Sequence, residues 1–136
     1  MNETSAKEWL TKGWHHLSTA NLLYDLNHYS DIVAVEIHYS TEITLKSILA
    51  FENSKIVKIH DLIEIYKLIK HRFTLPECDL SFLDIISEYH IRESYPSPHR
   101  RLPSREEIKS MLEFTNSLFA DVCTILNISI EEIKVL

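Results

Sequence analysis

The clearest helical pattern in the chain is SREEIKSMLEFTNSLFADVCTILN, which runs from Ser104 to Asn127. Ser104 and Glu107 have the three-residue spacing of a capping box, which satisfies free backbone N–H groups at the start of a helix. The residues that follow recur in steps of three and one, which places them on one face of an α-helix: Ile108, Met111, Leu112, Thr115, Leu118, Phe119, Val122, Ile125 and Leu126. The pattern predicts an amphipathic helix that ends near Asn127.

The remaining chain shows the same period in four further stretches. We expect helices over residues 5–27, 31–52, 61–72 and 79–94, and a short last turn over 130–136. Candidate caps precede these stretches: Asn2, Thr4 or Ser5 for the first, Ser30 and Asp31 for the second, Asp61 for the third, and Asp79 or Ser81 for the fourth. The second stretch is apolar on several faces, which is typical of a central helix.

The breaks between these stretches contain proline, and the strand signals are weak. Residues 73–79 form a loop around Pro76, and Pro96 and Pro98 end the fourth helix. No segment alternates apolar and polar residues for long, and the chain has no Asn-Gly or Asp-Gly turn. We therefore predict an all-α fold, an up-and-down antiparallel bundle of four to five helices, formed by residues 1–136 as a single domain.

Composition excludes several classes of function. The chain has 136 residues and one glycine, Gly13, so the glycine-rich phosphate loops of Rossmann and P-loop proteins are excluded. A formal charge of -6 argues against a broad nucleic-acid surface. Two cysteines, no signal peptide and no apolar run of about 18 residues favour a cytoplasmic protein without membrane contact. Neither Glu-x-x-His nor His-Glu-x-x-His occurs, so we predict no metal and no cofactor.

One polar line interrupts the apolar second helix. His38, Glu42 and Lys46 follow one another in steps of four and so lie on one face. The simpler interpretation is an exposed strip with a weak Glu-to-Lys pair. The alternative is a partly buried line that anchors a neighbouring helix or faces a cleft, because a central helix has little free surface. His60, just before the third helix, is typical of a cap or loop anchor.

A local basic cluster lies before the last long helix. Between Arg92 and Arg105 the chain places four arginines and His99, although the protein as a whole is acidic. Arginine binds phosphate bidentately and histidine exchanges protons near neutral pH, so the cluster suits capture or cleavage of a phosphodiester. The alternative is a solvated loop whose charges offset the acidic surface.

These features together resemble the HEPN (higher eukaryotes and prokaryotes nucleotide-binding) domain family, in its branch of short prokaryotic proteins, over about residues 5–127. Glu42 and Lys46 match the Glu-Lys spacing of that branch in its second helix. His60-Asp61-Leu62 matches a histidine followed by an apolar helix, and Tyr95-Pro96 matches a Tyr-Pro before the last helix.

The resemblance implies an activity and a set of site residues. Many HEPN proteins are metal-independent ribonucleases with an arginine, four to six residues, and then a histidine, a spacing that Arg92 and His99 satisfy. Arg92 would stabilise the charged phosphorane, and His99 would act as acid or base while a ribose 2′-hydroxyl attacks. The binding residues that we predict with this pair are Glu42, Lys46, His60, Tyr95, Arg100 and Arg101.

The resemblance also implies partners. Family members form homodimers, and we expect one here. Some members are non-catalytic nucleotide- or substrate-binding modules that pair with a separate minimal nucleotidyltransferase, often as toxin and antitoxin. The ribonuclease toxin, acting on RNA, and the nucleotide-binding module are therefore the two functions that the sequence leaves open.

Overall fold

The computed structural model describes residues 1–98 and 101–135. Over these residues the chain forms six α-helices and one 3₁₀ turn, and no strand. The elements are α1 (Glu3–Asp25), α2 (Ser30–Phe51), α3 (Leu62–Ile69), the 3₁₀ turn η1 (Glu77–Asp79), α4 (Leu80–Arg92), α5 (Arg105–Ile125) and α6 (Ile130–Ile133). The predicted all-α bundle is confirmed.

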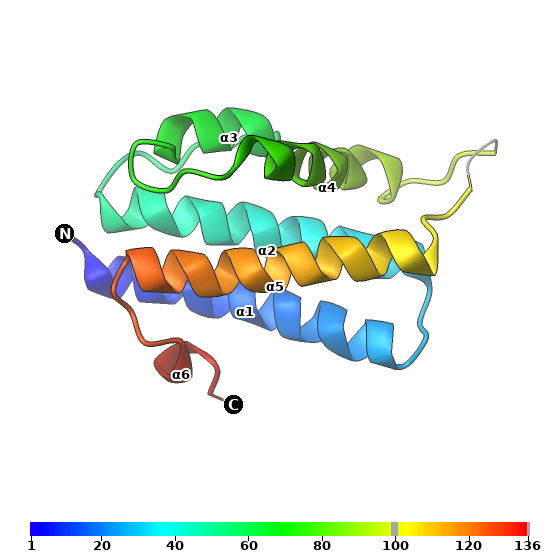
Figure 1. The fold of residues 1–136 in the computed structure, drawn as a ribbon, viewed down its shortest axis with the longest axis horizontal. Coiled ribbons are helices and arrows are strands. Elements are labelled where there is room, and N and C mark those ends of the chain that lie inside the picture. Colours follow the sequence, from blue (N-terminus) through cyan, green and yellow to red (C-terminus); the bar gives the residue numbers. More distant parts are fainter. Residues whose placement is uncertain (99–100, 136) are drawn as a thin grey trace.

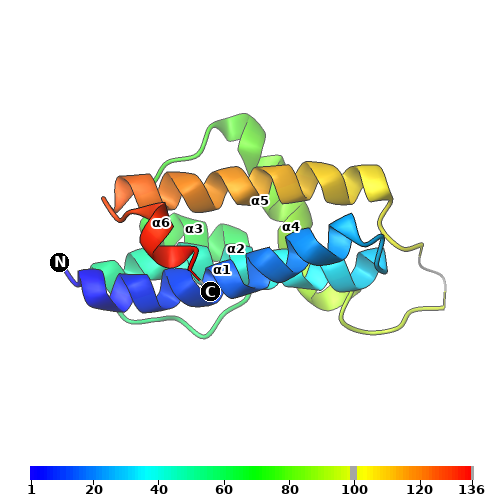
Figure 2. The same ribbon diagram turned by 90° about the horizontal axis from the view of Figure 1, so that it is seen from below.

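Helix α2 lies at the centre of the bundle. It packs against α1, α3, α4 and α5. Figure 1 shows α2 between α1 and the pair formed by α3 and α4, and the long helices α1, α2 and α5 run side by side in both views (Figures 1 and 2). Because α2 contacts four helices, its apolar residues are buried on several faces, as its sequence indicates.

Side chains cap three of the helices at their N-termini. Asn2 accepts a hydrogen bond from the N–H of Ser5, Asp61 from those of Ile63 and Glu64, and Ser104 from that of Glu107. The prediction that Ser30 and Asp31 cap the second helix is wrong. Its N-cap is Tyr29, no side chain caps it, and Asp31 accepts a bond from the adjacent N–H of Ile32.

Asparagine ends the three long helices. Asn27, Asn53 and Asn127 have φ values of 56°, 55° and 55°, in the left-handed region. At each of these ends, the N–H of the asparagine and the N–H of the next residue bond back to the last carbonyls of the helix, as in the bonds from Asn27 N to Tyr24 O and from His28 N to Leu23 O. This is the Schellman arrangement, and asparagine tolerates the left-handed conformation that glycine usually provides.

Several predicted boundaries shift. The first helix begins two residues earlier than expected, and the third ends at Ile69 instead of residue 72. The predicted last turn is shortened to Ile130–Ile133, where the buried Ile133 packs into the core and Lys134 lies over the ring of Trp14. Within residues 1–98 and 101–135, no helix combines the length and the apolar character that crossing a membrane requires.

Candidate functional site

The polar line of α2 is buried. His38, Glu42 and Lys46 are 0%, 6% and 5% exposed, because α4 and the segment before α3 cover this face of the helix. The exposed-strip interpretation is therefore wrong, and the buried line that anchors a neighbouring helix is confirmed. The anchor is His38, whose Nδ1 lies 2.9 Å from the backbone carbonyl oxygen of Ile86 in α4.

Three positively charged or proton-bearing side chains meet at the carboxylate of Glu42. His38 Nε2 and His60 Nδ1 lie 3.1 and 2.9 Å from Glu42 Oε1, and Lys46 Nζ lies 2.9 Å from Oε2. Burial alone would raise the pKa of Glu42, but the bonds from His38, Lys46 and His60 outweigh it and lower the pKa to about 2. Glu42 is therefore a carboxylate whose two oxygens are both held.

His60 places this cluster at the protein surface. It belongs to the segment between α2 and α3, its side chain is 52% exposed, and its bond to Glu42 ties that segment to α2. It therefore acts as a loop anchor, as its position predicted. The ring of His90 from α4 stacks on it, with 4.2 Å between centroids and 19° between planes.

His90 is the less exposed partner of this stack. Burial lowers the pKa of His90, and its neighbours His60 and His38 lower it further against the opposing effect of the Glu42 carboxylate. Its ring centroid lies 5.1 Å from that of His38, so three imidazoles from α2, α4 and the segment before α3 come together.

A cavity of about 280 Å³ opens beside these rings. His60 and His90 line it together with the carboxylate-bearing residues Asp61, Asp84 and Glu88. Histidine and carboxylate side chains offer nitrogen and oxygen donors to a cation. We call His38, Glu42, His60 and His90 the histidine cluster.

The basic cluster lies in the connection between α4 and α5. Arg92 is the last residue of α4, and its Nη1 lies 3.0 Å from Oε2 of Glu88, one turn earlier. Tyr95 is 73% exposed and Arg101 is exposed. A cavity of about 400 Å³ lies between this connection and the start of α2, lined by Arg92 and Tyr95 and by Asp31 and Ile32.

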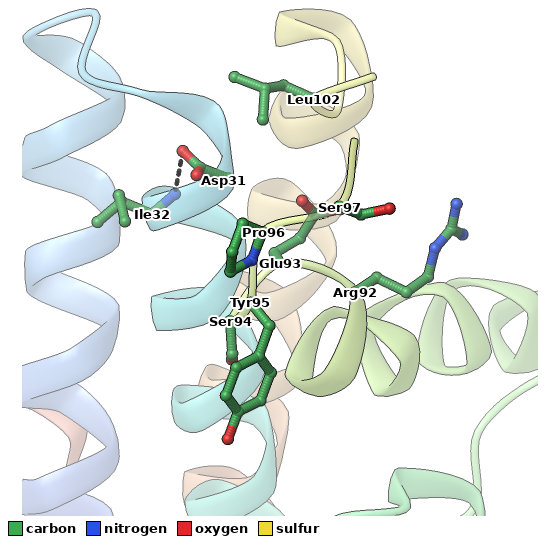
Figure 3. A pocket seen from close by; sticks show the side chains of 9 residues that line it. All are labelled: Asp31, Ile32, Arg92, Glu93, Ser94, Tyr95, Pro96, Ser97 and Leu102. Carbon is green, nitrogen blue, oxygen red and sulfur yellow. Dashed lines mark hydrogen bonds between the residues drawn. The ribbon is translucent and has the colours of Figure 1, made fainter. Parts of the chain in front are cut away.

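Figure 3 shows the side chains around this second cavity. Pro96 lies beside the start of α2, whereas the Arg92 side chain extends away from Asp31 and Ile32. The structure thus puts Arg92 and Tyr95 in one region. His99 and Arg100 lie outside the described residues.

The predicted site residues therefore fall into two groups. Glu42 and His60 belong to the histidine cluster and Lys46 contacts it through Glu42, while Arg92, Tyr95 and Arg101 belong to the connection before α5. Glu88 links the two groups, because it lines the cavity of the histidine cluster and also pairs with Arg92.

Two members of the histidine cluster were absent from the predicted site. The sequence places His38 only in the polar line, and no predicted site or polar line includes His90. No spacing relates residues 38, 60 and 90, since they come from three segments. The one available signal was a histidine on the inner face of a central helix, which must find a polar partner when it is buried.

The comparisons with known proteins agree with this fold. The family model described as the HEPN domain matches residues 6–126. The crystal structure of TT1696 from Thermus thermophilus is similar, with 21% sequence identity, a TM-score of 0.77, and alignment over 92% of this chain and 99% of that one. No curated protein matches the sequence. Since the family model spans most of its length, the chain belongs to the HEPN domain family.

Proposed function

We propose that this HEPN protein is a metal-independent ribonuclease of the toxin type, in which residues 1–136 work as one domain and Arg92 and His99 form the reactive pair. The observation that carries the proposal is the connection between α4 and α5. It concentrates arginine in an acidic protein, it exposes Tyr95 and Arg101, and it borders a cavity of about 400 Å³.

Each residue type in this connection suits a different part of an RNA strand. A guanidinium such as that of Arg92 binds two phosphate oxygens and stabilises the charge of a pentacoordinate phosphorane. His99 takes the proton of the 2′-hydroxyl or returns one to the leaving 5′-oxygen. Arg101, with Arg100, holds a neighbouring phosphate, and the exposed ring of Tyr95 offers a stacking surface to a base.

We propose that the active form is a homodimer. Ile32 lines the cavity at 44% exposure and Leu102 at 54%, and Tyr29, just before α2, is 70% exposed. Apolar and aromatic side chains gathered beside a charged segment are typical of protein interfaces. A second copy packed here would bring two sets of Arg92 and His99 together.

The test is cleavage of total RNA in buffer that contains EDTA. We expect the wild-type protein to produce fragments and His99→Ala to produce none. His15→Ala is the matched control, because His15 is exposed on α1, and it should cleave as the wild type does. Circular dichroism in the same buffer confirms that each protein keeps its helices. Identical fragment patterns from the wild type and His99→Ala refute the ribonuclease proposal.

One observation favours a second candidate, a non-catalytic module that binds a nucleotide or a minimal nucleotidyltransferase. Arg92 pairs with Glu88 and extends away from Asp31 and Ile32 across the cavity. Isothermal titration with nucleotides, and with a nucleotidyltransferase encoded beside this protein, tests the candidate. Binding without RNA cleavage supports the module, and no heat with either ligand counts against it.

A further inference from the structure

The contacts of His38 place two electron-rich groups against one ring. Its Nδ1 lies 2.9 Å from the carbonyl oxygen of Ile86, and its Nε2 lies 3.1 Å from Glu42 Oε1. A neutral imidazole has a single N–H, and the carbonyl can only accept it. The lone pair of Nε2 then faces the carboxylate, so a cation between the two atoms is required to make the contact attractive. That cation is either a second proton on the ring or a metal ion.

His60 adds a third donor to the same point. Its Nδ1 lies 2.9 Å from Glu42 Oε1, and one donor atom from each of His38, Glu42 and His60 lies within 4.8 Å of the other two. A tetrahedral Zn²⁺ with bonds of about 2.0 to 2.2 Å holds its ligand atoms roughly 3.3 to 3.6 Å apart. The distances of 3.1 and 2.9 Å from Glu42 Oε1 are slightly shorter than this spacing, so an ion between the three atoms requires the side chains to rotate apart.

We propose that His38 Nε2, Glu42 Oε1 and His60 Nδ1 bind a divalent transition-metal ion of the Zn²⁺ class. Two imidazole nitrogens and one carboxylate oxygen suit Zn²⁺, whereas Mg²⁺ and Ca²⁺ prefer oxygen ligands. The bond from His38 to Ile86 is the contact that typically orients a metal-binding histidine, because it holds the proton on Nδ1 and leaves Nε2 free.

The residues around the proposed site give a metal ion access from solvent and supply negative charge near it. His60 is half exposed, and the adjacent cavity of about 280 Å³ carries Asp61, Asp84 and Glu88, which attract a cation. Lys46 occupies the other carboxylate oxygen, Oε2, and leaves Oε1 for the ion. His60, one of the three proposed ligands, also lines this cavity, from which a water molecule would complete the coordination.

The test uses untagged protein that has been treated with EDTA and dialysed, because a polyhistidine tag would bind the same ions. Isothermal titration with Zn²⁺ should show one site per chain, and Mg²⁺ should give no heat. Co²⁺ should produce the visible absorption of a tetrahedral site, which Zn²⁺ then abolishes. The thermal midpoint should rise with Zn²⁺, since binding to the native state stabilises it.

His60→Ala and His71→Ala form a matched pair of variants. His71 is also an exposed histidine beside a carboxylate, 2.8 Å from Glu52, but it lies outside the histidine cluster. Loss of a contact that orients a metal ligand costs roughly 10-fold to 100-fold in affinity. His60 is a ligand itself, so we expect His60→Ala to weaken Zn²⁺ binding by more than this. His71→Ala should bind as the wild type does. His60 is half exposed, so its removal leaves the core intact, whereas Glu42→Gln removes the partner of the buried Lys46 and is a poorer test.

Three results overturn the proposal. The first is the absence of stoichiometric Zn²⁺ binding. The second is unchanged Zn²⁺ affinity in His60→Ala. The third is equal loss of affinity in His60→Ala and His71→Ala, which indicates adventitious binding to surface histidines.

Discussion

Gly13, the one glycine of the chain, lies where α1 meets α2, and its replacement by alanine tests that contact. A Cβ built at Gly13 would lie 2.9 Å from Thr44 Oγ1, 3.6 Å from Thr44 N and 3.7 Å from Ile43 Cγ2. Real Cβ atoms essentially never approach another heavy atom within 3.0 Å. The two helices are also joined here by a bond of 3.0 Å from Ser40 Oγ to Gly13 O, so neither helix can move away without cost.

Two opposing terms set the size of the effect. Alanine is favoured over glycine inside a helix by about 1 kcal/mol. Overpacking a core costs about 1 to 3 kcal/mol, and Thr44 is fully buried and β-branched, so its side chain rotates with difficulty. We expect Gly13→Ala to lower the free energy of unfolding by about 1 kcal/mol, which corresponds to a decrease in Tm of roughly 3 to 5 °C.

Urea denaturation of Gly13→Ala, Thr44→Ala and the double variant measures this coupling. Among the described residues, Thr44 Oγ1 has no hydrogen-bond partner, so its removal loses no bond. The double variant should recover stability beyond the sum of the single effects. The reasoning fails if Gly13→Ala alone stabilises the protein by about 1 kcal/mol, or if the two effects simply add.

Three further predictions concern a helix cap, a hydrogen bond and an ion pair. Ser104→Ala should destabilise the protein by about 1 kcal/mol in urea denaturation, because α5 loses its N-terminal cap. Tyr89→Phe removes the hydroxyl that donates to the Glu107 carboxylate and should cost about 1.5 to 2 kcal/mol; an unchanged midpoint contradicts this. Burial alone would raise the pKa of Glu52, but the hydrogen bond from Arg72 outweighs burial and the pKa is lowered. The ionised Glu52 therefore stabilises the folded protein at pH values above its unfolded pKa, and this contribution is lost as pH falls through its folded pKa. The free energy of unfolding of Glu52→Gln should not show this decrease at acid pH.

The helices could be predicted from the sequence because their signals are local. The step of three and four along each helix, and caps such as Asp61 and Ser104, depend only on residues within a few positions of one another. The contacts of a capping residue are harder to predict when its side chain also bonds to a residue far away in the sequence. The carboxylate of Glu107 accepts from Tyr89 in α4, a contact that no capping pattern contains.

The candidate site could be predicted only in part. Arg92 and Tyr95 belong to one short segment, so their proximity follows from the chain itself. His38, Glu42 and Lys46 share a helix face for the same reason. The sequence, however, left open whether that face is an exposed strip or a partly buried line. Burial decided between them, and burial depends on which helices cover α2.

Patterns in the sequence are sufficient to identify an all-α HEPN protein, with its arginines gathered before the last long helix and with Gly13 as its one glycine. Only the packing of the helices brings His38 and His60 to Glu42 and places the ring of His90 against both of them. The two kinds of feature differ because they depend on interactions over different distances along the chain. Helical period and caps act over a few residues, whereas a buried carboxylate selects its partners from whichever segments the packing of α3 and α4 onto α2 brings within hydrogen-bond distance.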